Sequence, residues 1–349
     1  MIVSTHDSAV VILSYNGRKW HEIFLPKIVE ESIGFYDVVL VDNASTDDTL
    51  EYIQTNFSSV KTISIPINHG FAFGYAEALK QIEAKYYVLL SADFEVTQSW
   101  FPPLLRAMQQ YQGLAACQPK IRYWRDKDHF EYAGAAGGFM DKWGYLFCRG
   151  RLFNDLEKDN GQYNDDIETF WASGGCLMVR ADLYHAVGGL DPDFYAHMEE
   201  VDLCWRLKNA GYKIGAIGSS TVYHVGGSVI SYGSPQKLFY NFRNSLILLL
   251  KNEKGSRLIW LFPLRLVLDG IAGLQFAFGG KFREVFTIIK AHFSFYISFR
   301  KWWKRRQAAQ KIIHFRNNEG IYPKSIIWDY FALRKKNFKA LKFTPKRLF

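Results

Sequence analysis

The sequence has few cysteines, and the four that it has are widely separated. Cys117, Cys148, Cys176 and Cys204 form no CxxC pair, so their spacing indicates neither a zinc ribbon nor a disulfide framework. The N-terminus lacks a basic leader followed by an apolar stretch and a small-residue cleavage site, and we expect no secretory signal peptide. These absences favour a reducing, cytosolic environment.

The sequence also lacks the glycine patterns of two common nucleotide-binding loops. It contains neither GxGxxG nor GxxxxGK followed by Ser or Thr, which argues against a dinucleotide fingerprint and against a P-loop. A bound nucleoside diphosphate would need another counter-charge, most simply a divalent metal held by acidic residues. The length of 349 residues suits one large domain or two ordinary ones.

Acidic residues are scarce in the last third of the chain. Residues 233–349 contain 24 Lys and Arg but 5 Asp and Glu, whereas residues 1–232 contain 19 and 29. A reversal of sign this sharp indicates two parts with different partners. We therefore predict a first domain over residues 1–232 and a C-terminal region over residues 233–349.

Apolar runs alternate with helical patterns through the first part of the chain. Continuous apolar runs suit strands that are covered on both faces, and four strand–helix repeats predict a mostly parallel α/β sheet. The runs cover residues 9–13, 37–41, 61–65 and 86–90. Between residues 118 and 163 the pattern fades, and we expect loops at the Gly- and Ala-rich residues 133–138 and at the polar residues 154–166.

Polar side chains follow the predicted strands directly. They are Ser14, Asn16, Asp42, Asn68 and Asp93. Ligands of parallel α/β sheets bind at the carboxyl ends of the strands, so we expect these side chains to share one site. For Asp42 and Asp93 the alternative interpretation is a turn residue that closes a strand.

An acidic cluster marks the stretch from residue 170 to residue 228. The pattern predicts a helix over 194–210 that ends before Gly211 and carries Glu199, Glu200 and Asp202 near its start. Crowding by neighbouring carboxylates raises a carboxylate's pKa, which suits a general base. A further strand then leads to His224.

Seven ordered motifs resemble those of family 2 glycosyltransferases with the GT-A fold, and most closely the bacterial rhamnosyltransferase-like branch. They are VVILSYNG, VDNASTD, NHGFAFG, LLSAD, residues 171–180, MEEVDLCWRLKNAG and VYHVGGS, and together they span residues 8–230. The resemblance implies a GT-A domain and inverting transfer from a nucleoside-diphosphate sugar to a hydroxyl of a lipid-linked or polysaccharide acceptor.

The resemblance also implies a metal site. Asp93 matches the last aspartate of the family's DxD motif, with Ser91 at its first position, and His224 matches a histidine that completes the site. Oxygen ligands of this kind suit Mg²⁺ or Mn²⁺, and Glu95 is a candidate outer ligand. For His224 the alternative is a hydrogen-bonded structural residue.

Asp42 matches an aspartate that recognises the base. A carboxylate that accepts from a pyrimidine N3–H favours thymidine or uridine, and thus dTDP-rhamnose or a UDP-sugar as donor. The residues that the resemblance assigns to the nucleotide sugar are Ser14, Tyr15, Asn16, Asp42, Asn68, Gly70, Ser91, Ala92 and Asp93.

Glu200 matches the general base, where a Glu replaces the commoner Asp. Such a carboxylate removes the proton of the acceptor hydroxyl as its oxygen attacks the anomeric carbon. The residues assigned to the acceptor and sugar side are Trp171, Gly174, Gly175 and Glu199; for Trp171 the alternative is a core residue.

The C-terminal region is rich in aromatic and basic residues. Residues 258–279 form a poor membrane span because Arg265 and Asp269 interrupt them, whereas residues 282–303 place aromatic and cationic residues at the spacing of an interfacial helix. We expect residues 258–306 to bind an anionic membrane, at the cytoplasmic face of the bacterial inner membrane and peripherally. The alternative is a helical subdomain packed on the catalytic core.

Two other classes of function compete with this interpretation. A basic, aromatic tail can bind nucleic acid, but no such motif accompanies it and the acidic first domain would repel a polyanion, so we expect no nucleic-acid partner. The substitutions at Ser91 and Glu200 leave open a catalytically inactive subunit that binds a nucleotide sugar.

Overall fold

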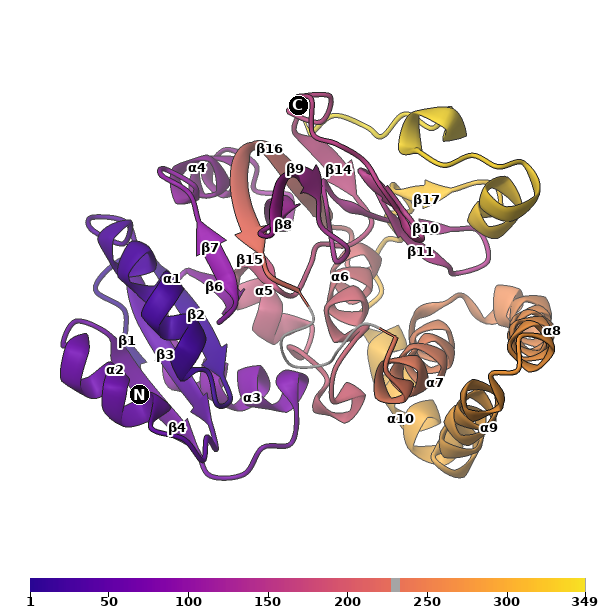
Figure 1. Cartoon of the computed structure of the whole chain (residues 1–349), viewed down its shortest axis with the longest axis horizontal. Helices are drawn as coiled ribbons and strands as arrows, with labels where there is room; N and C mark the ends of the chain where they lie inside the picture. Colours follow the sequence, from indigo (N-terminus) through magenta and orange to yellow (C-terminus); the bar gives the residue numbers. More distant parts are fainter. Residues whose placement is uncertain (227–232, 349) are drawn as a thin grey trace.

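A computed structural model describes residues 1–226 and 233–348 of the chain. A curled mixed sheet forms its centre, with the strand order β14-β16-β8-β15-β6-β2-β3-β4. Helices cover both faces of this sheet, and a group of C-terminal helices packs beside it (Figure 1). The predicted α/β fold is confirmed.

The predicted strands form the parallel half of the sheet. β2 (Ser8–Ser14), β3 (Asp37–Asn43), β4 (Lys61–Ile65) and β6 (Tyr86–Ser91) pair in parallel with β2 between β3 and β6. β15 (Cys176–Arg180) then pairs antiparallel with both β6 and β8 (Leu114–Tyr123). β8 runs parallel to β16 (Lys213–His224), and β14 (Ile167–Thr169) forms the edge.

Alternate residues of each central strand face opposite cores, as the two-residue period of a strand requires. Val10 and Ile12 pack with α1 (Arg18–Glu30) and α4 (Phe101–Gln110) on one face. The helix α2 (Thr49–Asn56) also lies on this first face. Val11 packs on the opposite face, against three other helices. These are α3 (Phe71–Ala78), α5 (Ala181–Ala186) and α6 (Glu199–Asn209).

The region between residues 118 and 163 holds the two predicted loops, residues 133–138 and 154–166, which lie largely outside helices and strands, but it also contains short strands that the pattern did not predict. It holds β9 (Asp126–Phe130), β10 (Gly138–Asp141), β11 (Leu146–Cys148), β12 (Arg151–Leu152) and β13 (Asp155–Leu156). These strands are short and separated by turns, so they lack the long apolar periodicity that predicts a strand. β10 to β13 form a second sheet together with β17 (Ile321–Tyr322) from the far end of the chain.

The C-terminal region forms four helices and then returns to the first domain (Figure 1). The helices are α7 (Pro235–Asn252), α8 (Gly255–Phe278), α9 (Phe282–Ile297) and α10 (Phe299–Lys311). After α10, β17 pairs in parallel with β10, and Phe338 packs between the rings of Phe139, Phe147 and Phe343. The boundary at residues 232 and 233 stays a prediction, but residues 320–348 pack on the first part of the chain.

Two short strand pairings and four short helical turns complete this account of the described residues. β1 (Ile2–Val3) pairs with β5 (Ile82–Glu83), and β7 (Phe94–Val96) pairs with β16. The remaining turns of helix are Leu79–Gln81, Pro192–Phe194 and Phe338–Leu341, together with one π-helical turn at Trp328–Ala332.

Phe338→Ala should lower the free energy of unfolding by about 3–5 kcal/mol, because it empties a buried aromatic site between the tail and the second sheet. The matched control is Phe331→Ala in the same tail, whose side chain is 57% exposed and whose loss should cost far less. Urea unfolding of both variants measures the difference. Equal stability of the two variants would show that the tail contributes nothing to the core.

Candidate functional site

The carboxyl ends of β2, β3 and β6 bring predicted site residues side by side. Ser14 is the register partner of Asp42, and Leu13 is the partner of Ser91. The next residues of each strand therefore meet at one edge of the sheet, as the parallel topology requires.

The loops after β2 and β3 hold each other. The Asn16 amide nitrogen donates to Ser45 Oγ at 2.9 Å, and Asn16 Oδ1 accepts from the Thr46 amide nitrogen at 2.8 Å. Asn16 has a φ of 49°, a left-handed conformation that asparagine tolerates better than most residues. Tyr15, beside it, is exposed. The asparagine therefore shapes the rim of the site through its side chain and its backbone.

Asp42 carries a free acceptor at this edge. The residue is buried; its Oδ2 accepts a long bond from the Ser45 amide nitrogen at 3.4 Å, whereas Oδ1 has no partner among the described residues. A buried acceptor without a donor is unfavourable, so the site is suited to a ligand N–H.

Ser14 points away from such a ligand, toward a residue that the sequence analysis did not select. Its buried Oγ lies 2.7 Å from Nε2 of His21 on α1. Burial lowers the pKa of His21 to about 4, with a small opposing effect of Asp47. Neutral His21 and Ser14 thus support the loop from below.

Asn68 and Gly70 form the loop before α3. Asn68 Oδ1 accepts from the Gly70 amide nitrogen at 2.9 Å and from Asn43 Nδ2 at 3.1 Å. Gly70 has a φ of 95°, and a Cβ there would lie 2.6 Å from the carbonyl oxygen of Tyr195. This loop therefore requires glycine and packs directly against the segment that leads into α6.

Asp93 and His224 lie together, as the predicted metal site requires. Asp93 Oδ2 is 3.2 Å from His224 Nε2, and neighbouring ligands of an octahedral Mg²⁺ lie about 3 Å apart. The described residues offer no group of three His, Cys, Asp or Glu arranged for a metal. Two protein ligands still fit Mg²⁺, because this ion usually keeps water and phosphate oxygens in its shell.

Glu131, which the sequence analysis did not select, lies on the other side of His224. Its Oε1 is 3.2 Å from His224 Nδ1, and the carboxylate is buried. Burial opposes a charged imidazole, but Asp93 and Glu131 outweigh it and raise the pKa of His224 to about 10. A carboxylate behind a ligating histidine orients the ring in many metal sites, and the imidazole must lose its proton to ligate a metal.

Glu95, the candidate outer ligand, is engaged elsewhere. Its carboxylate accepts from Trp124 Nε1 and from Lys127 Nζ, each at 2.6 Å. The carboxylate of Glu95 is thus held by Trp124 and Lys127. Ala92, between the two elements, is partly exposed.

The start of β15 lies beside both halves of the site. The Ser91 amide nitrogen donates to the carbonyl oxygen of Gly175 at 2.9 Å, and a Cβ at Gly175 would lie 2.7 Å from the ring of Phe94. A Cβ at Gly174 would lie 3.2 Å from Cβ of Glu200. The glycine pair therefore allows the acidic helix to approach the strand ends closely.

The acidic helix begins later than predicted. α6 starts at Glu199, not at residue 194, because Tyr195, His197 and Met198 have φ values of 69°, 68° and 73°. Such backbone conformations cannot belong to a right-handed helix. Glu199 and Glu200 consequently lie in the first turn, as predicted.

Glu199 and Glu200 each hold a buried carboxylate oxygen, Oε2, with no partner among the described residues. Burial raises the pKa of Glu200 to about 7, although backbone N–H groups of the helix start oppose it. Burial and the Glu200 charge raise the pKa of Glu199 well above its usual range. Glu200 can therefore exchange a proton near neutral pH.

Trp171 lies in the core. Its side chain is buried, its Nε1 donates to the carbonyl oxygen of Phe139 at 3.0 Å, and its ring covers Gly138. This placement favours the core interpretation over stacking on a sugar. Gly227 and Ser228 of the VYHVGGS motif lie outside the described residues.

Comparison with solved structures defines the class of protein. The fold is similar to that of GalNAc-T7 with UDP, GalNAc and Mn²⁺ (TM-score 0.54, 17% identity), over 70% of this chain and 47% of that one, so the chain spans about half of that structure. It is also similar to the mannosyltransferase PcManGT from Pyrobaculum calidifontis (TM-score 0.51, 14% identity, 88% and 85% of the two chains). The chain has the GT-A glycosyltransferase fold.

The sequence then places the chain within that class. Residues 9–188, just over half of the chain, match the model of glycosyl transferase family 2, and the chain belongs to this family. It is 24% identical over 284 residues to the N-acetylglucosaminyl-diphospho-decaprenol L-rhamnosyltransferase of Mycobacterium tuberculosis, covering 76% of this chain and 90% of that protein. The predicted family and the glycosyltransferase class are confirmed.

Mn²⁺ together with UDP or dTDP should raise the unfolding temperature by a few degrees, because a ligand at a hundred times its Kd adds about 2.7 kcal/mol of stability. Asp93→Ala should abolish the metal-dependent part of this shift. Glu95→Gln is the matched control, since that carboxylate lies two residues away and bonds Trp124 and Lys127. Thermal-shift assays of the wild type and both variants measure the unfolding temperatures. If Asp93→Ala shows the same metal-dependent rise as the wild type, the metal assignment is wrong.

Proposed function

We propose that the protein is an inverting, metal-dependent glycosyltransferase that moves a sugar from dTDP-rhamnose or a UDP-sugar to a hydroxyl of a lipid-linked glycan. The observation that carries the proposal is the buried carboxylate oxygen of Glu200 without a partner among the described residues, in the first turn of α6 and beside Gly174, just before the strand that pairs with β6.

Glu200 is the proposed general base. Its raised pKa of about 7 lets the carboxylate take the proton of an acceptor hydroxyl and release it again near neutral pH. The hydroxyl oxygen attacks the anomeric carbon, and the bond from that carbon to the diphosphate oxygen breaks. A single displacement of this kind inverts the configuration.

Asp93 and His224 are the proposed metal ligands, and Glu131 orients the imidazole of His224. A bound Mg²⁺ or Mn²⁺ would neutralise charge on the donor diphosphate. Asp42 Oδ1, buried and without a partner among the described residues, would accept from N3–H of uracil or thymine, and Asn16, Asn68 and Gly70 would form the walls around the nucleoside.

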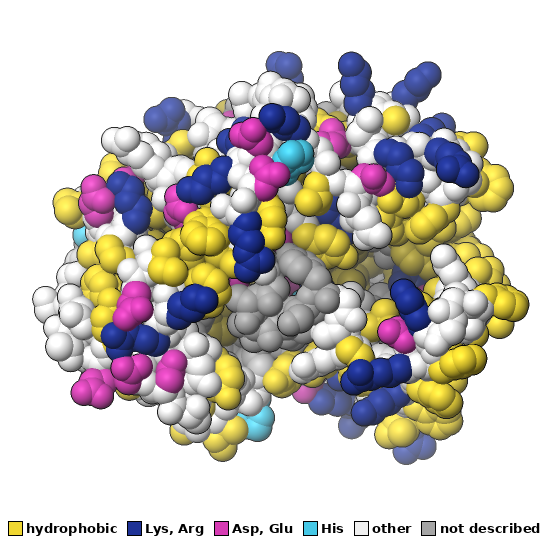
Figure 2. Space-filling model, viewed as in Figure 1, with side chains coloured by type: hydrophobic (Ala, Val, Ile, Leu, Met, Phe, Trp, Pro, Cys, Tyr) yellow, Lys and Arg dark blue, Asp and Glu magenta, His cyan; other side chains and the backbone are white. Residues whose placement is uncertain are grey.

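The proposed acceptor is a polyprenyl-diphosphate glycan, in keeping with the name of the mycobacterial relative. The C-terminal helices support a site at a membrane. Hydrophobic side chains and Lys or Arg side chains lie interspersed over α8 and α9 (Figure 2). The exposed apolar side chains of these helices are Ile259, Trp260, Val267, Ile271, Leu274, Phe278, Phe282, Phe286, Ile289, Phe293, Tyr296 and Ile297.

α8 is long and apolar enough, by length and composition, to cross a membrane, but its inner face is polar. Arg265 is buried; its Nε donates to Asp269 Oδ1 at 3.0 Å and its Nη2 to Ser245 Oγ at 3.0 Å, while Asp269 Oδ2 lies 3.1 Å from His292 Nε2. These contacts tie α8 to α7 and α9. We therefore propose that the helix lies in the plane of the membrane surface, with its apolar face toward lipid and Lys281, Arg283 and Lys290 toward anionic headgroups.

Glu200→Gln should lower kcat by at least about a hundredfold, because the amide cannot take the acceptor proton. In the wild type, kcat should fall as the pH drops below about 7, where Glu200 becomes protonated, and level off above. Glu30→Gln, at an exposed carboxylate of α1 that pairs with Lys27, is the control and should retain full activity. Transfer is measured with radiolabelled donor and a lipid-linked acceptor; full activity of Glu200→Gln would remove it from this role.

The wild type should float with vesicles that contain phosphatidylglycerol and bind pure phosphatidylcholine far more weakly, because each Lys or Arg near an anionic surface contributes about 1 kcal/mol. The double variant Phe286→Glu and Phe293→Glu, at positions that are 70% and 64% exposed, should lose binding by at least about tenfold. Ile33→Glu, at an exposed position on the loop after α1, is the control. Binding that resists alkaline carbonate would contradict a peripheral helix and favour a span.

A further inference from the structure

The backbone turn that leads into α6, residues 194–198, is held by contacts with α7 of the C-terminal region. After the single helical turn Pro192–Phe194, three residues other than glycine adopt left-handed φ values, Tyr195, His197 and Met198. Backbone of this kind is costly and persists only where its surroundings hold it. Since Glu199 and Glu200 follow directly, the same turn sets the position of the proposed base.

Asn244 of α7 is the main contact of this turn. Its side chain is fully buried, and its Nδ2 lies 3.1 Å from the carbonyl oxygen of Phe194, 3.0 Å from that of Ala196 and 2.7 Å from that of His197. An amide group has two N–H donors, so three carbonyls share them. One side chain thus satisfies the acceptors that the irregular backbone exposes.

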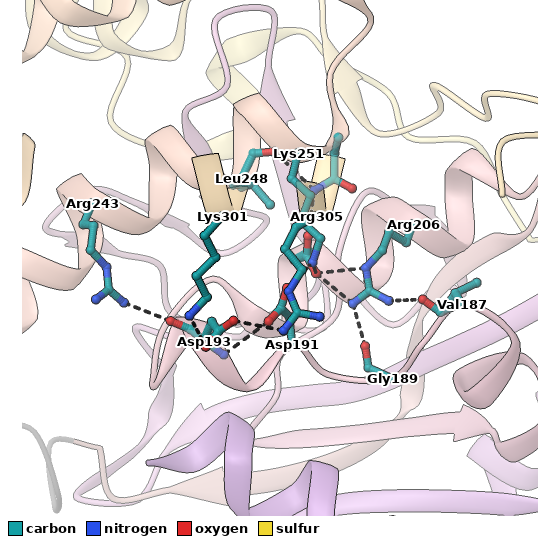
Figure 3. Close-up of polar contacts among 12 residues, drawn as sticks. Val187, Gly189, Asp191, Asp193, Arg206, Arg243, Leu248, Lys251, Lys301 and Arg305 are labelled. Carbon is teal, nitrogen blue, oxygen red and sulfur yellow. Dashed lines mark hydrogen bonds and ion pairs between the residues drawn. The ribbon is translucent and has the colours of Figure 1, made fainter. Parts of the chain in front are cut away.

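The neighbours of Asn244 on α7 support the same segment. Arg243 Nη2 donates to the carbonyl oxygen of Phe194 at 2.9 Å, and Figure 3 shows the guanidinium reaching toward Asp193. Tyr240 stacks on Tyr195 with ring centres 5.2 Å apart. On its other side, the Tyr195 carbonyl oxygen accepts from the Ala72 amide nitrogen at 3.1 Å. The turn therefore lies between α7 and the loop that precedes α3.

α7 also holds the body of α6. Lys251 Nζ donates to Asp191 at 2.7 Å and to Asp202 at 2.8 Å, and Asn252 Nδ2 donates to the second oxygen of Asp202 at 2.8 Å (Figure 3). These bonds fix the helix two residues after Glu200, whereas Asn244 fixes the turn before it. Between them, the first turn of α6 has no freedom to shift by itself.

We propose that Asn244 is a positioning residue for the Glu200 base, acting through the backbone of residues 194–198. This inference rests on the proposed function of Glu200. The helix α7 lies outside residues 9–188, which match the family model, and the inference gives this helix a part in the transfer reaction. Asn244 itself touches neither donor nor acceptor.

The test compares Asn244→Ala and Asn244→Asp with the wild type and with Asn241→Ala, a control on the same helix at a half-buried position. We expect Asn244→Ala to lower kcat by about ten- to a hundredfold, because small misplacement of a reacting group has effects of this size. Asn244→Asp should be at least as impaired, since a carboxylate would face three carbonyl oxygens. The donor KM and the shift with UDP or dTDP and Mn²⁺ should change by less than about threefold.

The pH profile separates positioning from loss of structure. Burial raises the pKa of Glu200. If loss of the Asn244 contacts admits water to Glu200, this pKa falls, and the drop in kcat near pH 7 should move to lower pH in Asn244→Ala. Among the described residues, the Glu200 charge acts on Glu199 and on the buried thiols of Cys148 and Cys204; burial raises the pKa values of the two thiols to about 11 and about 12. A partly unfolded sample would have a lower kcat at every pH, but kcat would fall at the same pH as in the wild type.

The outcomes are distinguishable. If the wild type transfers the sugar and Asn244→Ala has the same kcat and the same pH dependence, this inference is wrong and the proposed function stands. No transfer by the wild type overturns the proposed function first. If Asn244→Ala does not fold, Arg243→Ala, which removes a partly buried donor to the Phe194 carbonyl, decides the matter: it should give a smaller change of the same kind, and an unchanged profile would reject the inference.

Discussion

The buried carboxylate of Asp202 is the charge on which the arrangement of the site depends. It is inaccessible to solvent and bonded to Arg206, Lys251 and Asn252. Burial raises its pKa, but the two cations and the hydrogen bonds outweigh this and lower the pKa to about 2. Removing one partner of a buried ion pair typically costs about 3–5 kcal/mol, because the other charge is left uncompensated. α6 and α7 are therefore held together by more than apolar contact.

Asp202 and Glu200 show how one helix supports two opposite carboxylates. Asp202 is fully buried and Glu200 has a buried carboxylate oxygen, but Asp202 has two cations within hydrogen-bonding distance and stays ionised. Glu200 has backbone donors alone, so its pKa rises to about 7. Pairs of acids whose surroundings separate their pKa values commonly divide structural and catalytic roles in this way. The placement of Lys251, from a different part of the chain, thus separates the two.

The parts of the site that follow from local pattern could be predicted from the sequence. The strands before Ser14, Asp42 and Asp93 are continuous apolar runs, and strand ends are local features. Glu131, Asn244 and the left-handed turn at Tyr195–Met198 could not be predicted, because a buried partner or an irregular backbone depends on residues far along the chain. The same holds for β10 to β13, whose strands are too short to show a period and whose sheet includes β17.

The basic residues of the C-terminal region fall into two groups: some bond carboxylates and carbonyl oxygens within the protein, and others are exposed. Lys251 and Arg306 are buried and bond the Asp191–Asp202 network and the carbonyl oxygens of Leu250 and Glu253. Lys301 and Arg305 reach Asp193 on the segment before α6. Lys251, Lys301 and Arg305 thus offset the carboxylates of Asp191, Asp193 and Asp202 where the helices contact the rest of the chain. Lys281 and Lys290, by contrast, are exposed, and in the proposed arrangement they face the membrane. Under the proposed membrane binding, a count of basic residues therefore overstates the charge that the lipid surface would meet, and the exposed aromatic side chains of α9 would supply much of the attraction.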